Sequence, residues 1–179
     1  MNAPTHFKIS ATVDICLTDI RATDASAFVE HLNDEEIYAN TLRIPFPYTI
    51  EHAEQFIDIA AKAASEHGHP TCFAIRDEDE RLIGGCGFDG LSYGHRAELG
   101  YWLARPYWGQ GIMTAVVRAA CDHAVTQWKL ARITAHVFDQ NHRSARVLEK
   151  NNFQFEGLLR KHHHKDGKFI DSRLYALIS

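Results

Sequence analysis

The sequence predicts a single α/β domain, residues 1–179, in which a mixed sheet carries helices on both faces. Three observations predict this class. The chain has 179 residues, the usual size of one domain, and shows no internal repeat or linker. Its 45% hydrophobic and 23% charged residues are typical of a soluble globular protein that buries a core. Strand-like and helix-like segments follow one another in the order β α α β β β α β α β β.

The chain is expected to begin with a strand and a helix. The segment "VDICLTDI" (13–20) alternates between apolar and polar residues, which indicates a strand. The helix is expected over 23–42, with Thr23 or Asp24 as its N-cap. A stiff loop with two prolines, "IPFPYT", follows it.

A second helix and a hairpin come next. The helix is expected over 49–68, because Thr49 is a favourable N-cap and Gly68 a favourable helix end. Two strands follow, at 71–77 and 81–91. The polar "DEDE" between them favours a hairpin turn.

The central strand and helix lie on either side of two glycines. The segment "RAELGYWLA" (96–104) is typical of a strand. Its alternation places Glu98, Gly100 and Trp102 on one face and Ala97, Leu99, Tyr101 and Leu103 on the other. The helix that follows the glycines is apolar almost all round, so we expect it to be largely buried.

The C-terminal part is expected to alternate once more and to end in a hairpin. The segment 131–138 predicts a strand, and 141–152 a short helix with Asn141 as N-cap. Two strands, at 153–164 and 168–178, are joined through Asp-Gly, a pair that suits a tight hairpin turn.

Charge and composition argue against several classes of partner. The net charge is −4 and no dense Lys/Arg face is visible, so nucleic acid is not expected. The apolar runs are too short to span a membrane, and the N-terminus does not resemble a secretion signal. The four cysteines form no CxxC pair and suit reduced core residues of a cytoplasmic protein. His162 and His164 should face away from His163 on a regular strand, so we expect no metal there.

The glycines at 109 and 111 suggest an anion site. The first N–H groups of a helix have no partner within the helix, and the helix dipole adds positive character. Glycines let a phosphate approach those groups without meeting a Cβ. By itself the GxG spacing is weak, since it could simply close a strand-to-helix turn, and it matches neither a P-loop nor a dinucleotide fingerprint.

Longer stretches carry a resemblance. "RAELGYWLARPYWGQGIMTAVVRAACDHA" and "ARITAHVFDQNHRSARVLEKNNFQFEGLLR" are similar to the GNAT superfamily of acyl-CoA N-acyltransferases, and more closely to its RimJ/RimL-like branch of ribosomal-protein N-terminal acetyltransferases. The resemblance covers essentially the whole chain. It implies a GNAT fold, with a mostly antiparallel sheet of about seven strands. Trp108 and Met113 depart from the usual coenzyme motif, in a form familiar in this branch.

The resemblance implies acetyl-CoA as cosubstrate and no metal. Backbone N–H groups over 110–114 would hold the pyrophosphate, the strand end over 102–104 would pair with the pantetheine arm, and Asn141 would meet that arm from the opposite side. The expected coenzyme-binding residues are Trp102, Leu103, Ala104, Gly109, Gln110, Gly111, Ile112, Met113, Thr114 and Asn141.

Acetyl transfer to an amine needs a base, an oxyanion donor and a leaving thiolate. We expect Glu98 to be the base, with a pKa raised by partial burial; the alternative is a strand-edge carboxylate that pairs with an arginine. The usual tyrosine acid is replaced by Leu148. Ser144 matches a serine that this branch offers, although it could be an ordinary residue of the first helical turn. A backbone N–H over 102–104 is expected to bind the oxyanion.

The sequence therefore predicts an N-acetyltransferase that works by direct attack of a primary amine, as a monomer or homodimer. The preferred acceptor is the N-terminal amine of a protein or peptide, with Phe46 and Tyr48 as an apolar wall beside it. The alternatives are a small-molecule amine, such as an antibiotic or a polyamine, and a non-catalytic acyl-CoA-binding module.

Overall fold

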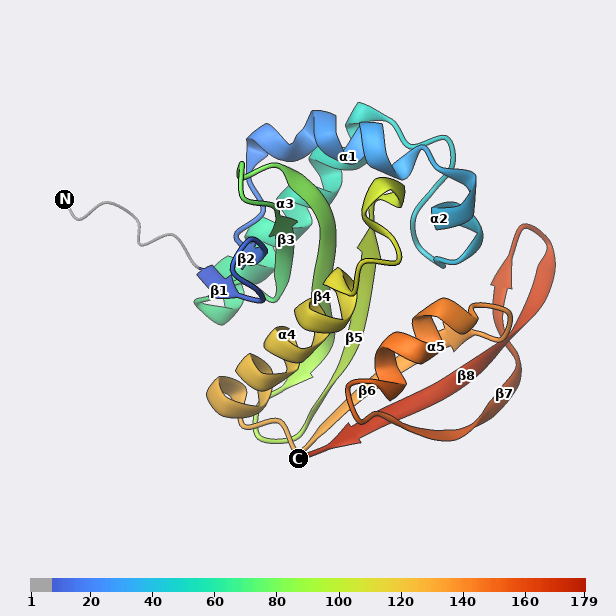
Figure 1. Ribbon diagram of the computed structural model, residues 1–179. Coiled ribbons are helices and arrows are strands. Elements are labelled where there is room, and N and C mark those ends of the chain that lie inside the picture. Colours follow the sequence, from blue (N-terminus) through green and yellow to red (C-terminus); the bar gives the residue numbers. More distant parts are fainter. Residues whose placement is uncertain (1–7) are drawn as a thin grey trace.

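One eight-stranded sheet runs through the computed structural model, which describes residues 8–179 (Figure 1). Its strand order is β1-β2-β3-β4-β5-β6-β8-β7. The strands are β1 (Lys8–Ser10), β2 (Cys16–Thr18), β3 (Cys72–Arg76), β4 (Leu82–Ser92), β5 (Arg96–Leu103), β6 (Arg132–Phe138), β7 (Gln154–Lys165) and β8 (Lys168–Ile178). Every neighbouring pair is antiparallel except β5 and β6, which are parallel. The predicted mixed, mostly antiparallel sheet is confirmed.

Helices cover both faces of this sheet, as predicted. The α-helices are α1 (Ala25–Leu32), α2 (Glu35–Ala39), α3 (Ile50–His67), α4 (Ile112–Trp128) and α5 (His142–Glu149), with short 3-10 turns at Ala22–Asp24 and Arg105–Tyr107. One apolar core joins α4 and α5 to the sheet, and a smaller one joins α1, α2 and α3 to its other face. Figure 1 shows α4 and α5 in front of the sheet and α3 behind it.

The N-terminal region differs most from the sequence prediction. The expected strand over 13–20 is only three residues long, and β1 is an additional strand that pairs with it. The expected helix over 23–42 is broken after Leu32. There the Asn33 amide donates to the backbone oxygen of Tyr48, and the Asp34 carboxylate caps a new helix by accepting from two of its N–H groups. A tertiary contact and a local cap together break the helix.

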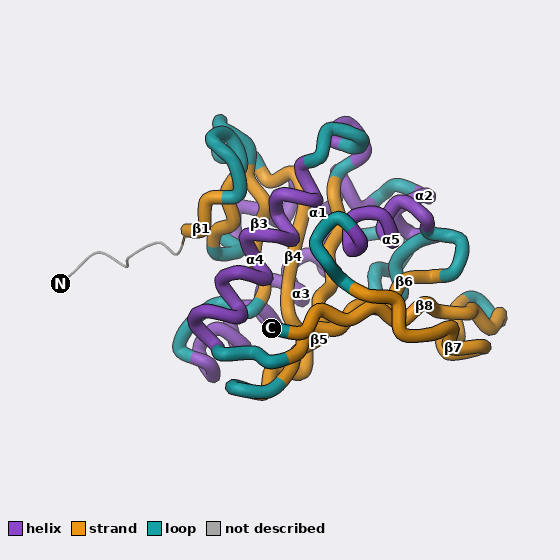
Figure 2. The backbone as a smooth tube through the Cα atoms, turned by 60° about the horizontal axis from the view of Figure 1, so that its bottom comes forward, coloured by secondary structure: helices purple, strands orange, loops and turns teal. Residues whose placement is uncertain are grey.

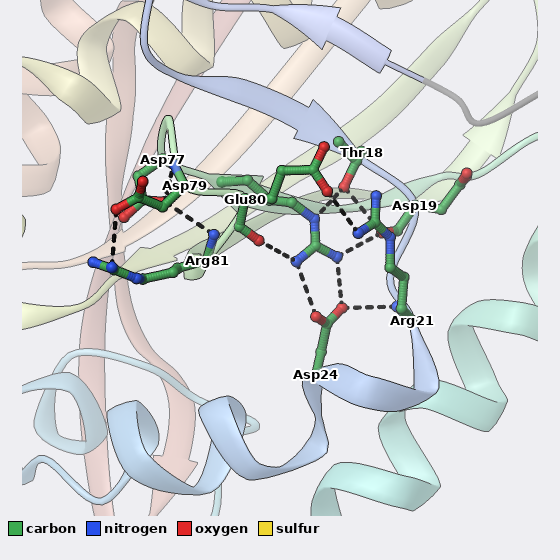
Figure 3. Close-up of polar contacts among 9 residues, drawn as sticks. Thr18, Asp19, Arg21, Asp24, Asp77, Asp79, Glu80 and Arg81 are labelled. Atoms are coloured by element: carbon green, nitrogen blue, oxygen red, sulfur yellow. Dashed lines mark hydrogen bonds and ion pairs between the residues drawn. The ribbon is translucent and has the colours of Figure 1, made fainter.

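A buried ion pair holds the start of α1 against β3 (Figure 3). The Arg76 guanidinium donates to both carboxylate oxygens of Asp24, at 2.9 and 2.8 Å, and its Nε donates to Thr18 Oγ1 at 2.7 Å. Backbone oxygens of Asp19 and Glu80 accept its remaining donors. Asp24 is the N-cap residue of α1, as expected, but its carboxylate neutralises a buried cation and makes no cap hydrogen bond to that helix.

The parallel strands β5 and β6 separate soon after they meet. Their ladder joins only Arg96–Glu98 with Arg132–Thr134, while β5 continues along β4 and β6 continues along β8. In Figure 1 the two strands diverge from a common base. The sheet is therefore split beyond Glu98, and we call this split the β5–β6 gap.

Candidate active site

The glycine loop lies at the start of α4. Gly109 and Gly111 both have positive φ, 78° and 79°, and Gly111 is the N-cap of α4. A Cβ added at either glycine would meet no atom within 4 Å, so packing does not explain them. The first hydrogen bond of the helix runs from Ala115 N to Gly111 O, at 3.2 Å. The N–H groups of residues 112–114 therefore precede it and have no partner within the helix, which is the arrangement that suits an anion.

The side chains of the loop are mostly held by the protein itself. Gln110 Nε2 donates to Pro106 O at 3.0 Å, and Met113 is buried in the core. Trp108 Nε1 donates to Leu103 O at 2.7 Å, which ties the loop to the end of β5. The groups that the loop leaves without a partner within the helix are thus backbone N–H groups, and their use by a coenzyme stays a prediction.

The end of β5 corrects one part of that expectation. Ala104 N donates to Ile83 O at 2.8 Å, so this N–H is bound to β4 and is not available to a pantetheine arm or an oxyanion. Successive residues of a strand direct their backbone N–H and C=O groups to opposite sides. The backbone groups of Trp102 therefore also face β4, whereas those of Leu103 and Tyr101 face the β5–β6 gap. Leu103 is thus the one residue of the predicted three whose N–H faces the gap.

A pair of hydroxyl groups spans the gap on the α4 and α5 face. Asn141 caps α5 as predicted, since its Oδ1 accepts from Ser144 N at 3.1 Å. Ser144 Oγ lies 2.8 Å from Tyr101 Oη, and that tyrosine hydroxyl also donates to Ser144 O at 3.2 Å. Burial raises the pKa of Tyr101, so it remains protonated. Sequence reasoning treated Tyr101 only as an apolar strand residue. Leu148, where the usual acid would stand, is fully buried.

Glu98 lies at the base of the gap on the opposite face of the sheet. Its Oε1 is 3.3 Å from His136 Nδ1, and its side chain is 45% exposed. This hydrogen bond to His136 holds the Glu98 pKa below its ordinary value, outweighing the effect of desolvation. The expected raised pKa was therefore wrong. The expected alternative, an arginine partner, is also not what is found, because Arg43 pairs with Asp89.

Phe46 and Tyr48, the two residues expected beside the acceptor, differ in exposure. Phe46 is 41% exposed and lies against the ring of Tyr38, with centroids 5.4 Å apart. Tyr48 is only 5% exposed and belongs to the smaller core, with Phe28 and Leu32. The prediction that Tyr48 forms part of an acceptor wall was wrong, because its ring is buried where α1 packs against α3.

The sequence did not reveal a set of charged side chains beside the glycine loop, which we call the charged strap. It consists of Asp34, Glu36, Arg105 and Arg143. Arg105 donates to Asp34 at 2.6 and 2.8 Å and to Glu36 at 2.8 Å, and Arg143 donates to the second oxygen of Glu36 at 2.7 Å. The two guanidinium groups lie 5.3 and 5.2 Å from the Trp108 ring. The strap joins α2 to the glycine loop and to α5, and Figures 1 and 2 both place α2 beside α5.

The described part of the chain also limits other chemistry. Over residues 8–179, no group of three or more His, Cys, Asp or Glu side chains is arranged to hold a metal ion. None of its helices combines the length and apolarity needed to span a bilayer. The four cysteines are free, and burial raises the pKa of Cys72, Cys86 and Cys121.

The chain thus combines a sheet that splits between β5 and β6 with a helix, α4, that begins at two glycines. The sequence matches the family described as Acetyltransferase (GNAT) domain over residues 14–154. An uncharacterized N-acetyltransferase, p20 of Bacillus licheniformis, is 30% identical over 168 residues, which are 93% of this chain and 94% of that protein. The chain therefore belongs to the GNAT acetyltransferase family, and it is an N-acetyltransferase.

Further relatives lie in the ribosomal-protein branch, which confirms the resemblance seen in the sequence. Ribosomal-protein-serine acetyltransferase of Escherichia coli (strain K12) is 32% identical over 114 residues, 63% of each protein. Among solved structures, RimL, the ribosomal L7/L12 α-N-protein acetyltransferase in complex with coenzyme A, has a TM-score of 0.86 at 19% identity and covers 96% of this chain and 98% of its own. GNAT acetyltransferases use acetyl-CoA and an amine acceptor.

Proposed function

We propose that this protein transfers the acetyl group of acetyl-CoA to the α-amine at the N-terminus of a protein or peptide. The observation that carries the proposal is the placement of Glu98 at the base of the β5–β6 gap, ionised and held by His136. The hydroxyl pair of Ser144 and Tyr101 lies on the other face of the same gap. A thioester in the gap would have a carboxylate on one side and hydroxyl groups on the other.

The residues around the gap suit the coenzyme. The N–H groups after Gly111, which have no partner within the helix, suit a pyrophosphate, and the N–H of Leu103, which faces the gap, suits an amide carbonyl of the pantetheine arm. Bound acetyl-CoA supplies the acyl thioester. The protein positions that thioester, orients the amine and handles the protons.

Each proton has an assigned acceptor or donor. The neutral amine forms the new N–C bond as the C–S bond breaks, and Glu98 accepts the proton that the nitrogen loses. Ser144 passes its hydroxyl proton to the departing sulfur, and Tyr101 Oη, 2.8 Å from Ser144 Oγ, turns its own proton to the serine oxygen as that proton leaves. The leaving group needs little help, because a thiol has an ordinary pKa of about 8.5.

The lowered pKa of Glu98 favours an α-amine over a lysine. An ionised carboxylate of low pKa is a weak base, so it serves best an acceptor that is already partly neutral. At pH 7.4 an α-amine of pKa about 7.8 is neutral in roughly a quarter of molecules, whereas a lysine of pKa about 10.4 is neutral in about one in a thousand. The relatives named for ribosomal-protein acetylation support the same choice.

The acceptor is tested by competition. Thiol release from acetyl-CoA is measured with short peptides that begin in Ala, Ser or Met, with the same peptides blocked at the N-terminus but carrying a lysine, and with spermidine. We expect the free N-terminal peptides to react fastest. Faster release with blocked peptides or spermidine would contradict the α-amine assignment. Tight coenzyme binding without release on any acceptor would favour a non-catalytic module.

A further inference from the structure

Three imidazole rings gather beside Glu98. His136 of β6 stacks on His162 of β7, with ring centroids 5.0 Å apart and an interplanar angle of 15°. His163 lies edge-on to His136 at 6.0 Å and to His162 at 4.5 Å. We call His136, His162 and His163 the imidazole cluster. In the account above, His136 appears only as the partner of Glu98, and His162 and His163 have no role.

An irregularity of β7 makes the cluster possible. On a regular strand His162 and His163 would face opposite sides of the sheet. The β7–β8 register instead shifts between Leu159 and His163, and Lys161 adopts a positive φ of 53° while its N–H donates to the Asp171 carboxylate at 2.7 Å. The bulge turns both rings toward His136.

The cluster lies where the backbone ladder between β5 and β6 ends. Glu98 pairs with Thr134 in the last register position of that ladder, and His136 is two residues further along the same face of β6. Its side chain reaches back to Glu98 Oε1 at 3.3 Å. The imidazole therefore bridges the two strands at the point where the gap opens.

We propose that His136 is a positioning residue for Glu98: its Nδ1–H holds the carboxylate toward the β5–β6 gap, and the stacked His162 and edge-on His163 hold the His136 ring in that orientation. The inference rests on the proposed function, in which Glu98 accepts the amine proton. The bulge of β7 therefore acts on Glu98 through two contacts, from His162 to His136 and from His136 to Glu98.

The arginine near Glu98 has another partner, and the nearby His163 is neutral near pH 7. Arg43, from the loop before α3, pairs with Asp89 of β4, which is opposite Glu98 in the β4–β5 ladder. His163 is partly desolvated, which lowers its pKa and keeps it neutral near pH 7. His136 is therefore the direct hydrogen-bond partner of Glu98, and Arg43 and His163 act on it only at longer range.

Two substitutions separate positioning from bulk packing. His136→Asn keeps an N–H donor near the place of Nδ1, and His136→Leu removes it. His164→Ala is the control, because His164 is exposed and lies against Phe169 on the outer part of the hairpin. The measurements are the pH profile of kcat/KM, kcat and KM separately, coenzyme affinity, and the Glu98 carboxyl pKa from side-chain carbon NMR.

We expect His136→Leu to lower kcat at least 10-fold, to leave coenzyme affinity unchanged, and to move both the Glu98 pKa and the acid limb of the profile to higher pH. His136→Asn should keep most of kcat, and its Glu98 pKa and acid limb should stay as low as in the wild type. His164→Ala should match the wild type in every measurement. A Glu98 pKa that does not rise in His136→Leu, or an Asn variant as slow as the Leu variant, would overturn the inference.

The NMR titration needs no turnover, so the two proposals can fail separately. Normal turnover of N-terminal peptides by His136→Leu contradicts the positioning role while the proposed function stands. A rise of the Glu98 pKa in that variant, in a protein that acetylates none of the acceptors, contradicts the proposed function while the contact between the two side chains stands.

Discussion

Glu98 shows how far the chemistry of one residue depends on its neighbours. Partial burial alone would raise a glutamate pKa, and the sequence offered no other visible influence. The imidazole of His136, which lies 38 positions further along the chain, reverses that direction. The carboxylate is therefore ionised throughout the neutral range, and its protonation is not what controls the rate near pH 7.

This environment gives a prediction for the pH dependence. Because the folded-state pKa of Glu98 lies below its ordinary value of 4.5, the acid limb that it causes should fall below that pH. Between pH 6 and 8 the rate should instead rise as the acceptor amine loses its proton, with an apparent pKa of about 7.7–8.0 for an α-amine. Glu98→Gln should lower kcat by about 100- to 10,000-fold with coenzyme affinity unchanged.

The check is a steady-state profile from pH 4 to 9 with one N-terminal peptide, together with calorimetric titration of coenzyme A. A Glu98→Gln enzyme with near-wild-type turnover would return this carboxylate to a structural role. A wild-type acid limb near pH 6 would contradict the lowered pKa.

At the scale of elements, the glycine loop has two possible reasons for its glycines, a tight turn and room for a ligand. The sequence could not separate them. Both glycines have positive φ, so the turn alone explains their lack of a side chain. The open space beside them is the additional feature that suits a ligand. A substitution at Gly111 alone would mix backbone strain with loss of the cradle.

Gly68 offers a matched control that separates backbone strain from loss of the cradle. It has φ 75°, it ends α3, and a Cβ there would also meet no atom within 4 Å. Gly111→Val and Gly68→Val should therefore lose similar stability, measured by urea unfolding. Coenzyme affinity should weaken at least 10-fold, about 1.4 kcal/mol, only in Gly111→Val. Equal coenzyme affinity in the two folded variants would contradict the phosphate cradle.

The elements that the sequence predicted are those with local signals. Thr49 and Gly68 bound α3, and Asn141 caps α5, because capping is decided within a few residues. The break after Leu32 was missed because Asn33 bonds to Tyr48, fifteen positions away. The bulge of β7 was missed for the same reason, since it depends on pairing with β8 and on Asp171.

At the scale of the whole molecule, the site is a property of the sheet and not of any motif. The glycine loop, Glu98 and the hydroxyl pair of Tyr101 and Ser144 lie around one gap because β5 and β6 separate after three paired positions. Local patterns identified the glycine loop, Asn141 and Glu98 as candidates. They could not identify Tyr101, His136 or the strap of Asp34, Glu36, Arg105 and Arg143, whose partners are distant in sequence.

The fold of the N-terminal segment depends on the buried pair of Arg76 and Asp24, whose side chains are only 2% and 6% exposed. Asp24→Asn keeps the shape but leaves a buried guanidinium without its counter-charge, so we expect a loss of about 3–5 kcal/mol in the free energy of unfolding. The double variant Asp24→Leu with Arg76→Met removes both charges. It should recover much of that loss, because apolar replacement of a whole buried pair is often close to neutral.

Urea unfolding of the wild type, the single variant and the double variant measures this difference, and coenzyme affinity reports on the site. That affinity should be unchanged in the folded variants, because the pair ties α1 to β3 and makes no contact with the glycine loop. A loss below about 1 kcal/mol in Asp24→Asn would show that water reaches the guanidinium. A double variant less stable than the single one would show that the five hydrogen bonds of Arg76, and not charge balance, hold the N-terminal segment to the sheet.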